Sequence, residues 1–496
     1  MKKGFTLIEL LAVILILGII ALIAIPTVNN ILLESRQGAF RSTLNSIERK
    51  IQETCTAQQI KNEEIVTEYV ISNGTISPAL DIKGDLPEGT IYVDNNCDVT
   101  YVLYNSNFEG TKNSAEDELV INKCEGTCIR YKETVLNGAD PELDTGMIPV
   151  VITNDGSVTK ANIYTKWYEY GAKNWANAVL VKESSREAYQ NAKGGTSIAS
   201  DDILAYFVWV PRFKYYITTS GTTTPSSISI EFENKRTLKS TGNAVSTYLT
   251  HPAFTFGSTE LNGFWMGKFE TTGEANAPTV LPNKTSQTGD DVKTNFNSAR
   301  LLIGNTYGIT SNARHMKNSE WGAAAYLSHS SYGINGEIRV NNNNVVTTGC
   351  GASEVNGGET SACQIAYGGA TSYPQSSTGN ISGVFDMSGG RWDRVMFMYN
   401  SMLSSSGFTS YPEAKYYDNV TSLTYNQACN GGICYGQALS ETVGWYSDKN
   451  GAYTETYPWI GRGSYYKGTS GAGTFAIGYC HGGPCGDGFR ITISKE

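Results

Sequence analysis

Ten cysteines are the residues of this 496-residue chain with the most evident chemistry. Eight of them fall into four close couples, and an even number of cysteines in an exported protein is typical of disulfides. We therefore expect each couple to close a local loop and the remaining two cysteines to complete the set. The couples are Cys124 with Cys128, Cys350 with Cys363, Cys429 with Cys434 and Cys480 with Cys485, and the remaining pair is Cys55 with Cys97.

Metal binding is the alternative use of these cysteines. Zinc sites favour closely spaced cysteines combined with histidines, but His251, His315, His329 and His481 are scattered and the chain has no Cys-x-x-Cys pair. The pattern therefore favours disulfides, and we expect no metal site and no cofactor. Calcium stays open, although a calcium site for sugar binding needs clustered carboxylates and amides, and no compact acidic cluster stands out.

No other combination of residues predicts catalysis. The chain has no recognisable catalytic triad, phosphate-binding loop or metalloprotease motif. The acidic pairs Glu116-Asp117 and Asp201-Asp202 are isolated, and we interpret both as solvated surface. A net charge of −9 without basic runs makes nucleic-acid binding unexpected as well. We expect a protein that is not an enzyme and has no nucleic-acid partner.

The element that must position the rest of the chain is an apolar stretch at residues 5–25. A helix of about 21 residues spans roughly 30 Å, the thickness of the hydrocarbon core of a membrane. Lys2 and Lys3 precede the stretch, so the positive-inside rule predicts a single-pass membrane protein whose bulk lies outside the cell. Glu9 interrupts the stretch, and a carboxylate at that depth costs about 2.5–3.5 kcal/mol unless it finds a partner.

The N-terminal sequence resembles that of the type IV pilins. The resemblance rests on Gly4-Phe5-Thr6-Leu7-Ile8-Glu9, the apolar run that follows, and Pro26. It implies that a prepilin peptidase cleaves between Gly4 and Phe5 and that Phe5 is then N-methylated. It also implies that Glu9 pairs with the N-terminal amine of a neighbouring subunit and that Pro26 kinks the helix. The expected partners are therefore other pilin subunits, prepilin peptidase and the membrane.

Apolar periodicity extends the helix to about residue 57, with one stripe that would pack on a sheet. The stripe comprises Leu33, Phe40, Leu44, Ile47, Ile51 and Cys55. Short alternating segments follow, among them a hairpin in which 90–93 and 99–104 flank Asp94-Asn95-Asn96. We expect an α+β protein that begins with a long helix on a small antiparallel sheet. The predicted divisions are a prepilin leader at 1–4, a transmembrane and assembly helix at 5–57, a pilin-like β domain at 58–145 and a larger domain at 146–496.

The larger domain resembles the formylglycine-generating-enzyme-like branch of the C-type lectin fold. The segments that carry the resemblance occur in the family's order: Met266–Thr272, Asn318–Trp321, Gly379–Trp392, Arg462–Ser464 and Gly488–Arg490. The resemblance covers most of the domain and implies a C-type-lectin-like α+β fold. Because that fold hosts both enzymes and binding proteins, the fold alone does not give the function.

The oxidising enzymes of that family bind copper through a close cysteine pair that follows the Arg-Gly-Ser-type segment. In this chain Tyr465 and Tyr466 occupy that place, and Cys480 comes later. The Asn-x-Trp-Glu-Trp signature of the family is also altered here, at residues 390–394. A Gly-Gly-Pro sequence before Cys485 suits a disulfide loop, so the departures favour a binding protein over an enzyme.

Binding proteins of this fold use the stretch between the Arg-Gly-Ser strand and the Gly-Phe-Arg segment as a recognition surface. Tyrosines and small polar residues supply contact area and adaptable hydrogen bonds at low entropic cost. The resemblance therefore implies an extracellular ligand, protein or glycan. The candidate ligand-binding residues are Tyr465, Tyr466, Lys467, Tyr479, His481 and Asp487.

Together these features predict a type IV pilus subunit that displays a lectin-like ligand-binding domain for surface adhesion. The bulk of the extra domain favours a minor or tip subunit. Two alternatives remain: a pseudopilin of a type II secretion or competence system, and a structural pilin whose C-terminal domain binds no ligand. The expected locations are the cell membrane and the extracellular pilus.

Overall fold

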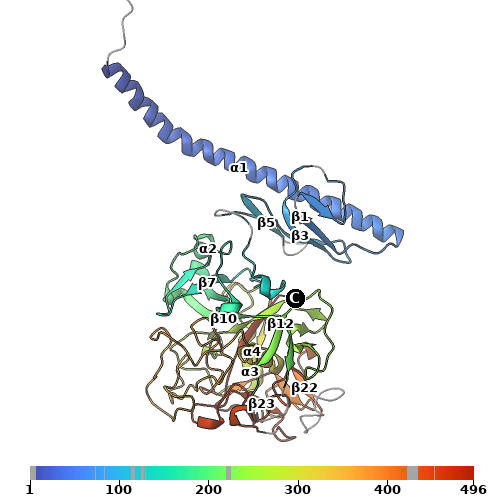
Figure 1. Ribbon diagram of the computed structural model, residues 1–496, viewed down its shortest axis with the longest axis vertical. Helices are drawn as coiled ribbons and strands as arrows, with labels where there is room; N and C mark the ends of the chain where they lie inside the picture. Colours follow the sequence, from blue (N-terminus) through green and yellow to red (C-terminus); the bar gives the residue numbers. More distant parts are fainter. Residues whose placement is uncertain are drawn as a thin grey trace, which may run out of the picture. The chain divides into compact units, whose positions relative to one another are not determined.

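The computed structural model describes residues 7–72, 74–82, 84–112, 118–124, 128, 130–218, 225–421, 434–451 and 453–495, and for residues 7–30 it describes the backbone alone. The chain divides into two compact units, Met1–Arg130 and Tyr131–Glu496. Both combine helices with predominantly antiparallel sheets, so the predicted α+β class is confirmed (Figure 1).

The first unit is built on one long helix, α1 (Leu7–Lys61), which runs for 55 residues and past the predicted end at residue 57. The predicted apolar stripe faces the core, and Leu33 packs partly buried at its edge. Phe40 is 4 % exposed, and Leu44, Ile47 and Ile51 are fully buried. The period of the apolar residues therefore gave the buried face of α1 correctly.

α1 packs on a six-stranded antiparallel sheet with the spatial order β2-β1-β3-β4-β5-β6. The predicted hairpin is confirmed, because β3 and β4 pair from Val93 opposite Val99. The strands are β1 (Glu68–Ser72), β2 (Thr75–Ser77), β3 (Glu88–Val93), β4 (Val99–Tyr104), β5 (Phe108–Lys112) and β6 (Val120–Lys123).

Two features hold α1 close to this sheet. A Cβ atom at Gly110 of β5 would lie only 2.2 Å from Cδ1 of Leu44, so glycine is what lets the helix approach the strand. The disulfide between Cys55 and Cys97 ties the end of α1 to the β3–β4 turn. The helix and sheet therefore form one core.

The second unit is organised around a seven-stranded sheet with the order β19-β26-β16-β10-β9-β7-β8. β10 is buried over almost its whole length, and the last strand, β26, pairs with both β16 and β19. The strands are β7 (Ile148–Ile152), β8 (Val158–Lys160), β9 (Asn177–Val181), β10 (Ile203–Pro211), β16 (Gly263–Gly267), β19 (Asn312–His315) and β26 (Ile491–Ser494).

Smaller elements surround this sheet, and one of them is the fully buried helix α4. The helices are α2 (Glu183–Asn191), α3 (Val292–Arg300) and α4 (Asn318–Ser328). The remaining strands are β11 (Phe213–Ile217), β12 (Ile228–Phe232), β13 (Leu249–Thr250), β14 (Thr255–Phe256), β15 (Thr259–Glu260), β17 (Thr272–Glu274), β18 (Ala277–Thr279), β20 (Asp393–Arg394), β21 (Phe397–Tyr399), β22 (Asp418–Val420), β23 (Trp459–Arg462), β24 (Ile477–Cys480) and β25 (Gly488–Phe489). Short 3₁₀ helices are Thr134–Leu136, Tyr170–Ala172, Ser200–Asp202, Pro252–Phe254, Ala414–Tyr416, Trp445–Ser447 and Thr469–Gly471.

The boundary between the units lies between Arg130 and Tyr131, earlier than the predicted boundary after residue 145. The reason is tertiary: the polar segment after Tyr131 is bound into the second unit. Trp209 Nε1 donates to the carbonyl of Ala139 at 2.9 Å, and the Tyr168 hydroxyl donates to Asp140 at 2.6 Å. These hydrogen bonds to buried aromatic residues make the segment part of the second unit.

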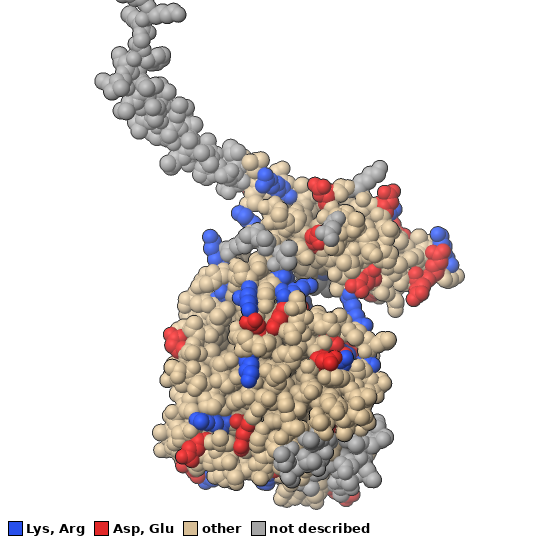
Figure 2. Space-filling view, viewed as in Figure 1, with Lys and Arg blue, Asp and Glu red and all other residues tan. Residues whose placement is uncertain are grey.

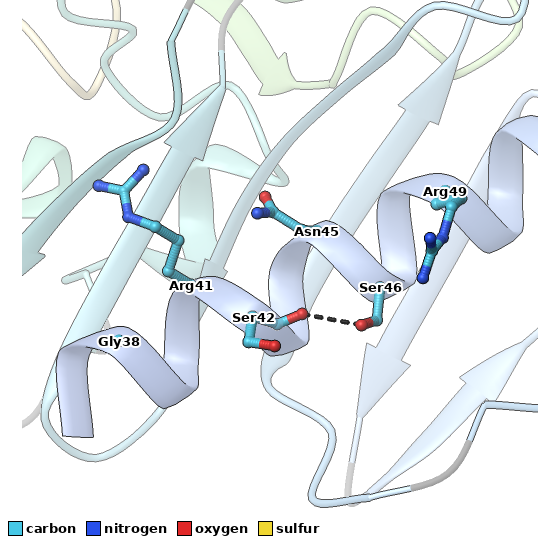
Figure 3. Close-up of a pocket in the computed structure, with 6 residues that line it drawn as sticks. All are labelled: Gly38, Arg41, Ser42, Asn45, Ser46 and Arg49. Atoms are coloured by element: carbon cyan, nitrogen blue, oxygen red, sulfur yellow. Dashed lines mark hydrogen bonds between the residues drawn. The ribbon is translucent and has the colours of Figure 1, made fainter. Parts of the chain in front are cut away.

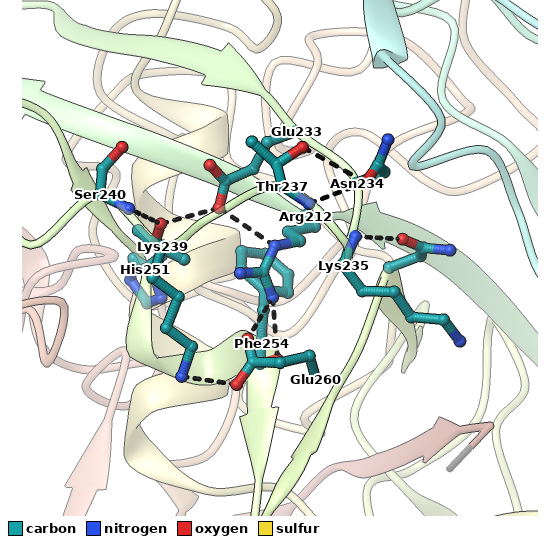
Figure 4. A network of polar contacts seen from close by, with 12 residues as sticks. Arg212, Glu233, Asn234, Lys235, Thr237, Lys239, Ser240, His251, Phe254 and Glu260 are labelled. Carbon is teal, nitrogen blue, oxygen red and sulfur yellow. Dashed lines mark hydrogen bonds and ion pairs between the residues drawn. The ribbon is translucent and has the colours of Figure 1, made fainter. Parts of the chain in front are cut away.

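A buried arginine fixes the loops that follow β10. Arg212 is fully buried and forms ion pairs with Glu233 at 3.0 Å and Glu260 at 2.7 Å (Figure 4). It also donates to the carbonyls of Phe254 and Leu261. Removing either partner of such a pair leaves a buried charge, so this network specifies the loop conformation strongly.

Candidate functional site

A pair of cysteines lies where β24 ends and the chain returns to β25. The sequence predicts a disulfide between Cys480 and Cys485, and this prediction is wrong. Both are free thiols whose Sγ atoms lie 3.5 Å apart, against about 2.05 Å in a disulfide. Other groups hold the second sulfur: the Cys485 thiol lies 3.0 Å from Asp487 Oδ2, and Arg394 Nη2 donates to it.

Hydrogen bonding and charge make the two thiols unequal. The hydrogen bond with Cys485 and the Arg394 guanidinium lower the pKa of Cys480 to about 7, although burial opposes this shift. The contact with Cys480, burial and the Asp487 carboxylate raise the pKa of Cys485. The buried Arg394 also lies 3.6 Å from Asp487. Cys480 is therefore the more acidic thiol and the one that carries the negative charge near neutral pH.

The same residues have the donor set of a soft-metal site. Ligand atoms of Cys480, Cys485 and Asp487 all lie within 4.8 Å of one another. Sulfur ligands bind zinc at about 2.3 Å, so one ion can bridge sulfurs 3.5 Å apart. Thiolates select ions such as Cu(I) and Zn²⁺. The residues fit such an ion, which the sequence pattern did not predict.

Three of the predicted ligand-binding residues gather around a tryptophan. The ring of Tyr465 stacks near Trp392 with centroids 6.5 Å apart and planes at 22°, and Tyr466 packs edge-on against Tyr465 at 5.7 Å. Lys467 Nζ lies 5.5 Å from the ring centre of Tyr466. A Cβ at Gly478 of β24 would approach Trp392 at 3.0 Å, so glycine makes room for the indole on the strand. We call Trp392, Tyr465 and Tyr466 the aromatic cluster.

The other predicted residues lie elsewhere. Tyr479 and His481 pack against Tyr457, with ring centroids at 5.1 Å and 6.3 Å respectively. Tyr479 follows Gly478 in β24, and successive residues of a strand face opposite sides of the sheet. Tyr479 therefore faces away from the aromatic cluster. Asp487 belongs to the thiol pair, so the six predicted residues occupy three places and form no single surface.

Three residues that contact the predicted ones were not identified from the sequence. They are Arg394 at the thiol pair, Trp392 in the aromatic cluster and Tyr457 beside Tyr479 and His481. Arg394 and Trp392 lie in the altered signature at 390–394, and neither was among the candidate ligand-binding residues. The exposed Tyr457 gave no signal that separates it from the other tyrosines, of which the chain has 30. The altered signature itself was the usable sign, because its last two residues form β20, which pairs with β23.

Most of the other predicted disulfides are present in the structure. Three predicted bridges are confirmed, namely Cys55–Cys97, Cys124–Cys128 and Cys350–Cys363. Cys434 is also disulfide-bonded, whereas Cys429 lies outside the described residues.

The predicted processing and assembly residues lie at the other end of the chain. Gly4 and Phe5 fall outside the described residues, and so do the side chains of Glu9 and Pro26. Within the part of the chain that the structure describes, no helix is long and apolar enough to cross a membrane. The predicted span at 5–25 falls outside the described side chains.

The described part of α1 has an exposed polar face opposite its apolar stripe. Two arginines flank a set of small polar side chains there, around a shallow hollow (Figure 3). Ser46 Oγ donates back to the carbonyl of Ser42 at 2.8 Å, so this hydroxyl is satisfied within the helix. We call this the α1 polar face, and it consists of Gly38, Arg41, Ser42, Asn45, Ser46 and Arg49.

Comparisons with known proteins bear on the N-terminal region. Residues 1–25 match the family described as the prokaryotic N-terminal methylation motif. The chain is similar to the type IV major fimbrial protein FimA of Dichelobacter nodosus, with 35% identity over 100 residues, which cover 19% of this chain and 62% of that protein. The match thus spans less than two thirds of the length of this relative. The chain thus carries a prokaryotic N-terminal methylation motif and is similar, over 100 residues, to a type IV fimbrial protein.

Proposed function

We propose that this chain is a processed type IV pilus subunit, minor or at the pilus tip, that displays a lectin-like domain for adhesion. The observation that carries the proposal is the methylation motif at residues 1–25, placed at the start of a 55-residue helix whose second half packs on an antiparallel sheet. The N-terminal half of such a helix can insert into the membrane and then into the filament. The C-terminal half packs in the core of its own unit.

Processing and assembly follow from the N-terminal residues. Prepilin peptidase cleaves between Gly4 and Phe5, and the apolar stretch holds the subunit in the membrane before assembly. In the filament, the Glu9 carboxylate pairs with the N-terminal amine of a neighbouring subunit. This pairing offsets the cost of placing a carboxylate among apolar side chains.

The α1 polar face supports contacts between subunits. It is exposed within its own unit, and Arg41 and Arg49 lie two turns apart on it (Figure 3). Guanidinium groups form bidentate contacts with carboxylates. Acidic side chains of neighbouring pilin subunits are therefore the partners that this face fits.

The lectin-like assignment of the second unit is supported by how its resembling segments meet. Arg490, from the closing Gly-Phe-Arg segment, donates to Asp393 at 2.7 Å, to the carbonyl of Phe385 at 2.7 Å and to that of Gly267 at 3.2 Å. Three segments that are far apart in the sequence therefore contact one buried arginine. We expect such a contact if the three segments belong to a single fold.

The displayed unit is proposed as a binder and not as an enzyme. The aromatic cluster offers rigid contact area beside Lys467, which suits recognition of an extracellular protein or glycan. So large an extra unit on every subunit would crowd a filament, which favours a minor or tip position. The proposal includes neither a calcium site nor a nucleic-acid partner.

The test is incorporation of a Glu9→Ala variant into filaments. The variant loses the carboxylate that pairs with the neighbouring N-terminus, so it should reach the membrane in normal amounts but fall several-fold in the sheared filament fraction. Glu34→Ala changes an exposed carboxylate further along α1 and should incorporate normally. Normal incorporation of Glu9→Ala would refute the assigned role.

A second candidate function rests on Cys480 and Cys485, whose thiols are free and adjacent. They support a soft-metal site, because thiolates select ions such as Cu(I) and Zn²⁺. Titrating the reduced protein with Cu(I) or Zn²⁺ against a competing chelator should give one ion per chain. The Cys480→Ser, Cys485→Ser double variant should lose that ion, and unchanged binding would exclude this site.

A further inference from the structure

Three buried carboxylates lie near one another in the core of the second unit. Glu270 follows β16, Asp386 precedes β20 and Asp393 belongs to β20, and each is at most 2 % exposed. Arg490 donates to Asp393 at 2.7 Å, and its other hydrogen bonds go to backbone carbonyls. Neither Glu270 nor Asp386 forms an ion pair with any residue that the structure describes. The three acids therefore share a single positive charge.

No other cation or metal site among the described residues offsets the excess of negative charge. The buried Lys268 lies two residues before Glu270, but its Nζ donates to Asn177 Oδ1 at 2.8 Å and to two backbone carbonyls at 2.6 and 2.9 Å. In the part of the chain that the structure describes, ligand atoms converge closely enough for a metal ion only at the thiol pair. A proton is therefore the group that neutralises one of these acids.

The contacts of Glu270 suit the protonated form of its carboxyl group. One oxygen accepts a hydrogen bond from the backbone N–H of Arg391 at 2.8 Å. The other oxygen contacts the hydroxyl of Ser286, which lies 3.3 Å from the carbonyl of Val346. A protonated Glu270 donates to Ser286, and Ser286 then donates to Val346, so each of these protons has an acceptor.

Burial and mutual repulsion raise the pKa values of all three acids. Burial, followed by the charges of Asp393 and Asp386, raises the pKa of Glu270 well above its usual value. Burial also raises the pKa of Asp386 and that of Asp393 to about 6, although the charge of Arg490 opposes both shifts. Glu270 is therefore the acid that keeps its proton to the highest pH.

The segment that contacts Glu270 leads directly to the aromatic cluster. Arg391, whose N–H binds Glu270, precedes Trp392, and Tyr466 N donates to the carbonyl of Gly390 at 3.0 Å. Gly390 has φ +71°, and a Cβ there would lie 2.5 Å from Glu270 Oε1, so glycine lets the segment approach the acid. The position of the aromatic cluster thus depends on the contact between Glu270 and residues 390–391.

We propose that Glu270 is a pH-sensitive clamp, which holds residues 390–391 while it is protonated and releases them when it ionises. Ionisation leaves an unpaired charge in the core, and such a charge costs several kcal/mol unless water reaches it. The segment that carries Trp392 opens to admit that water. The aromatic cluster is therefore ordered in acid and loosens as the pH rises, whatever ligand it binds.

The sign of the pH effect follows from the raised pKa of Glu270. In the open state the carboxyl group is solvated and loses its proton near the ordinary pKa of 4.5, whereas in the closed state it retains the proton to higher pH. Below pH 4.5 both states hold the proton, and the closed state is fully favoured. As the pH rises above that value, the stability of the closed state falls until the pH reaches the pKa of the closed state.

Hydrogen exchange of the full-length chain in detergent tests the clamp. Protection factors of peptides that cover 389–393 and 465–468, corrected for the intrinsic pH dependence of exchange, measure how often the segment opens. In the wild type, this protection should fall about tenfold or more between about pH 5 and about pH 8, since one unit of pKa difference changes an equilibrium tenfold. Unchanged protection over this range would overturn the proposal.

Glu270→Gln tests whether Glu270 is the group that titrates. Glutamine has the shape of the protonated acid, so its amide accepts from Arg391 and donates to Ser286. Protection in this variant should equal that of the wild type in acid and should stay constant as the pH rises. Glu187→Gln removes an exposed carboxylate of α2 and should respond to pH as the wild type does.

Three results for Glu270→Gln would contradict the clamp. A pH response like that of the wild type would assign the response to another acid. Weaker protection than the wild type in acid, or failure to fold, would mean that the closed state needs the charged carboxylate. Because these measurements use neither a ligand nor filaments, their failure leaves the filament test of Glu9→Ala untouched, and failure of that test would leave the clamp intact.

Discussion

The acidity of Cys480 depends on its immediate neighbours. Cys485 lies within hydrogen-bonding distance, and Arg394 supplies a fixed positive charge. Such an environment is typical of reactive cysteines, since the thiolate is the nucleophile and the metal ligand. Asp487 acts mainly on Cys485, where it favours the protonated form. The pair therefore offers one thiolate and one thiol near neutral pH.

This asymmetry predicts the pH dependence of alkylation. The thiolate fraction of Cys480 should rise with pH around a midpoint of about 7, so its labelling by iodoacetamide should follow that curve. Cys485→Ala removes the hydrogen bond that contributes most to the lowered pKa and should move the midpoint upward. Mass spectrometry of the peptide that contains Cys480 gives the rate at each pH.

Two results would contradict this description of the thiol pair. A wild-type midpoint near the ordinary thiol value of 9.0 would mean that Arg394 and Cys485 do not stabilise the thiolate. Labelling that requires prior reduction would mean that a disulfide joins the two cysteines after all.

At the scale of elements, the contact between α1 and β5 is what makes the first unit one core. Phe40 and Leu44 reach the sheet at Gly110, where no side chain intervenes. On the opposite side of α1, Gly38 faces open space. The two glycines therefore have different roles: Gly110 is required for packing, whereas Gly38 only weakens the helix.

Gly110→Ala should destabilise the first unit by about 1–3 kcal/mol, because the new methyl group overlaps Leu44 and forces the core to shift. Gly38→Ala is the matched control and should stabilise α1 by up to about 1 kcal/mol. Hydrogen exchange of the β4 and β5 peptides reports on this unit alone. Equal protection in Gly110→Ala and wild type would show that α1 does not pack as closely as described.

Local sequence patterns predicted helices and strands. Features that depend on tertiary contacts could not be predicted from those patterns. The apolar stripe of α1 follows from the helical period, and the β3–β4 hairpin follows from the alternating segments around Asp94-Asn95-Asn96. The free thiols did not follow from spacing, because Arg394 and Asp487 meet Cys485 through the fold.

For the whole molecule, the two units have separate properties. The first unit contains the methylation motif. The similarity of the chain to a fimbrial protein supports the pilin-like part of the proposal. The second has the larger core, with Trp175, Trp209 and Trp265 among its fully buried side chains. Its visible face carries few charged side chains (Figure 2), in keeping with 17% charged residues in the chain. Such a surface suits contacts through hydroxyl, amide and aromatic groups.

The proposed role requires both units in one place: a processed N-terminus in the filament and the second unit exposed outside the cell. Membrane retention alone would give an anchored protein without assembly. Filament location without processing would contradict the peptidase step. The N-terminus of the protein recovered from filaments therefore bears on the central claim more directly than any binding assay.

Mass spectrometry of sheared surface filaments from the native cell is that measurement. We expect a peptide that begins at N-methylated Phe5, recovered together with peptides from the second unit in the same fraction. An intact Met1 terminus, found in membranes and absent from filaments, would mean that the N-terminal helix serves as an anchor alone and would contradict the assignment as a pilus subunit.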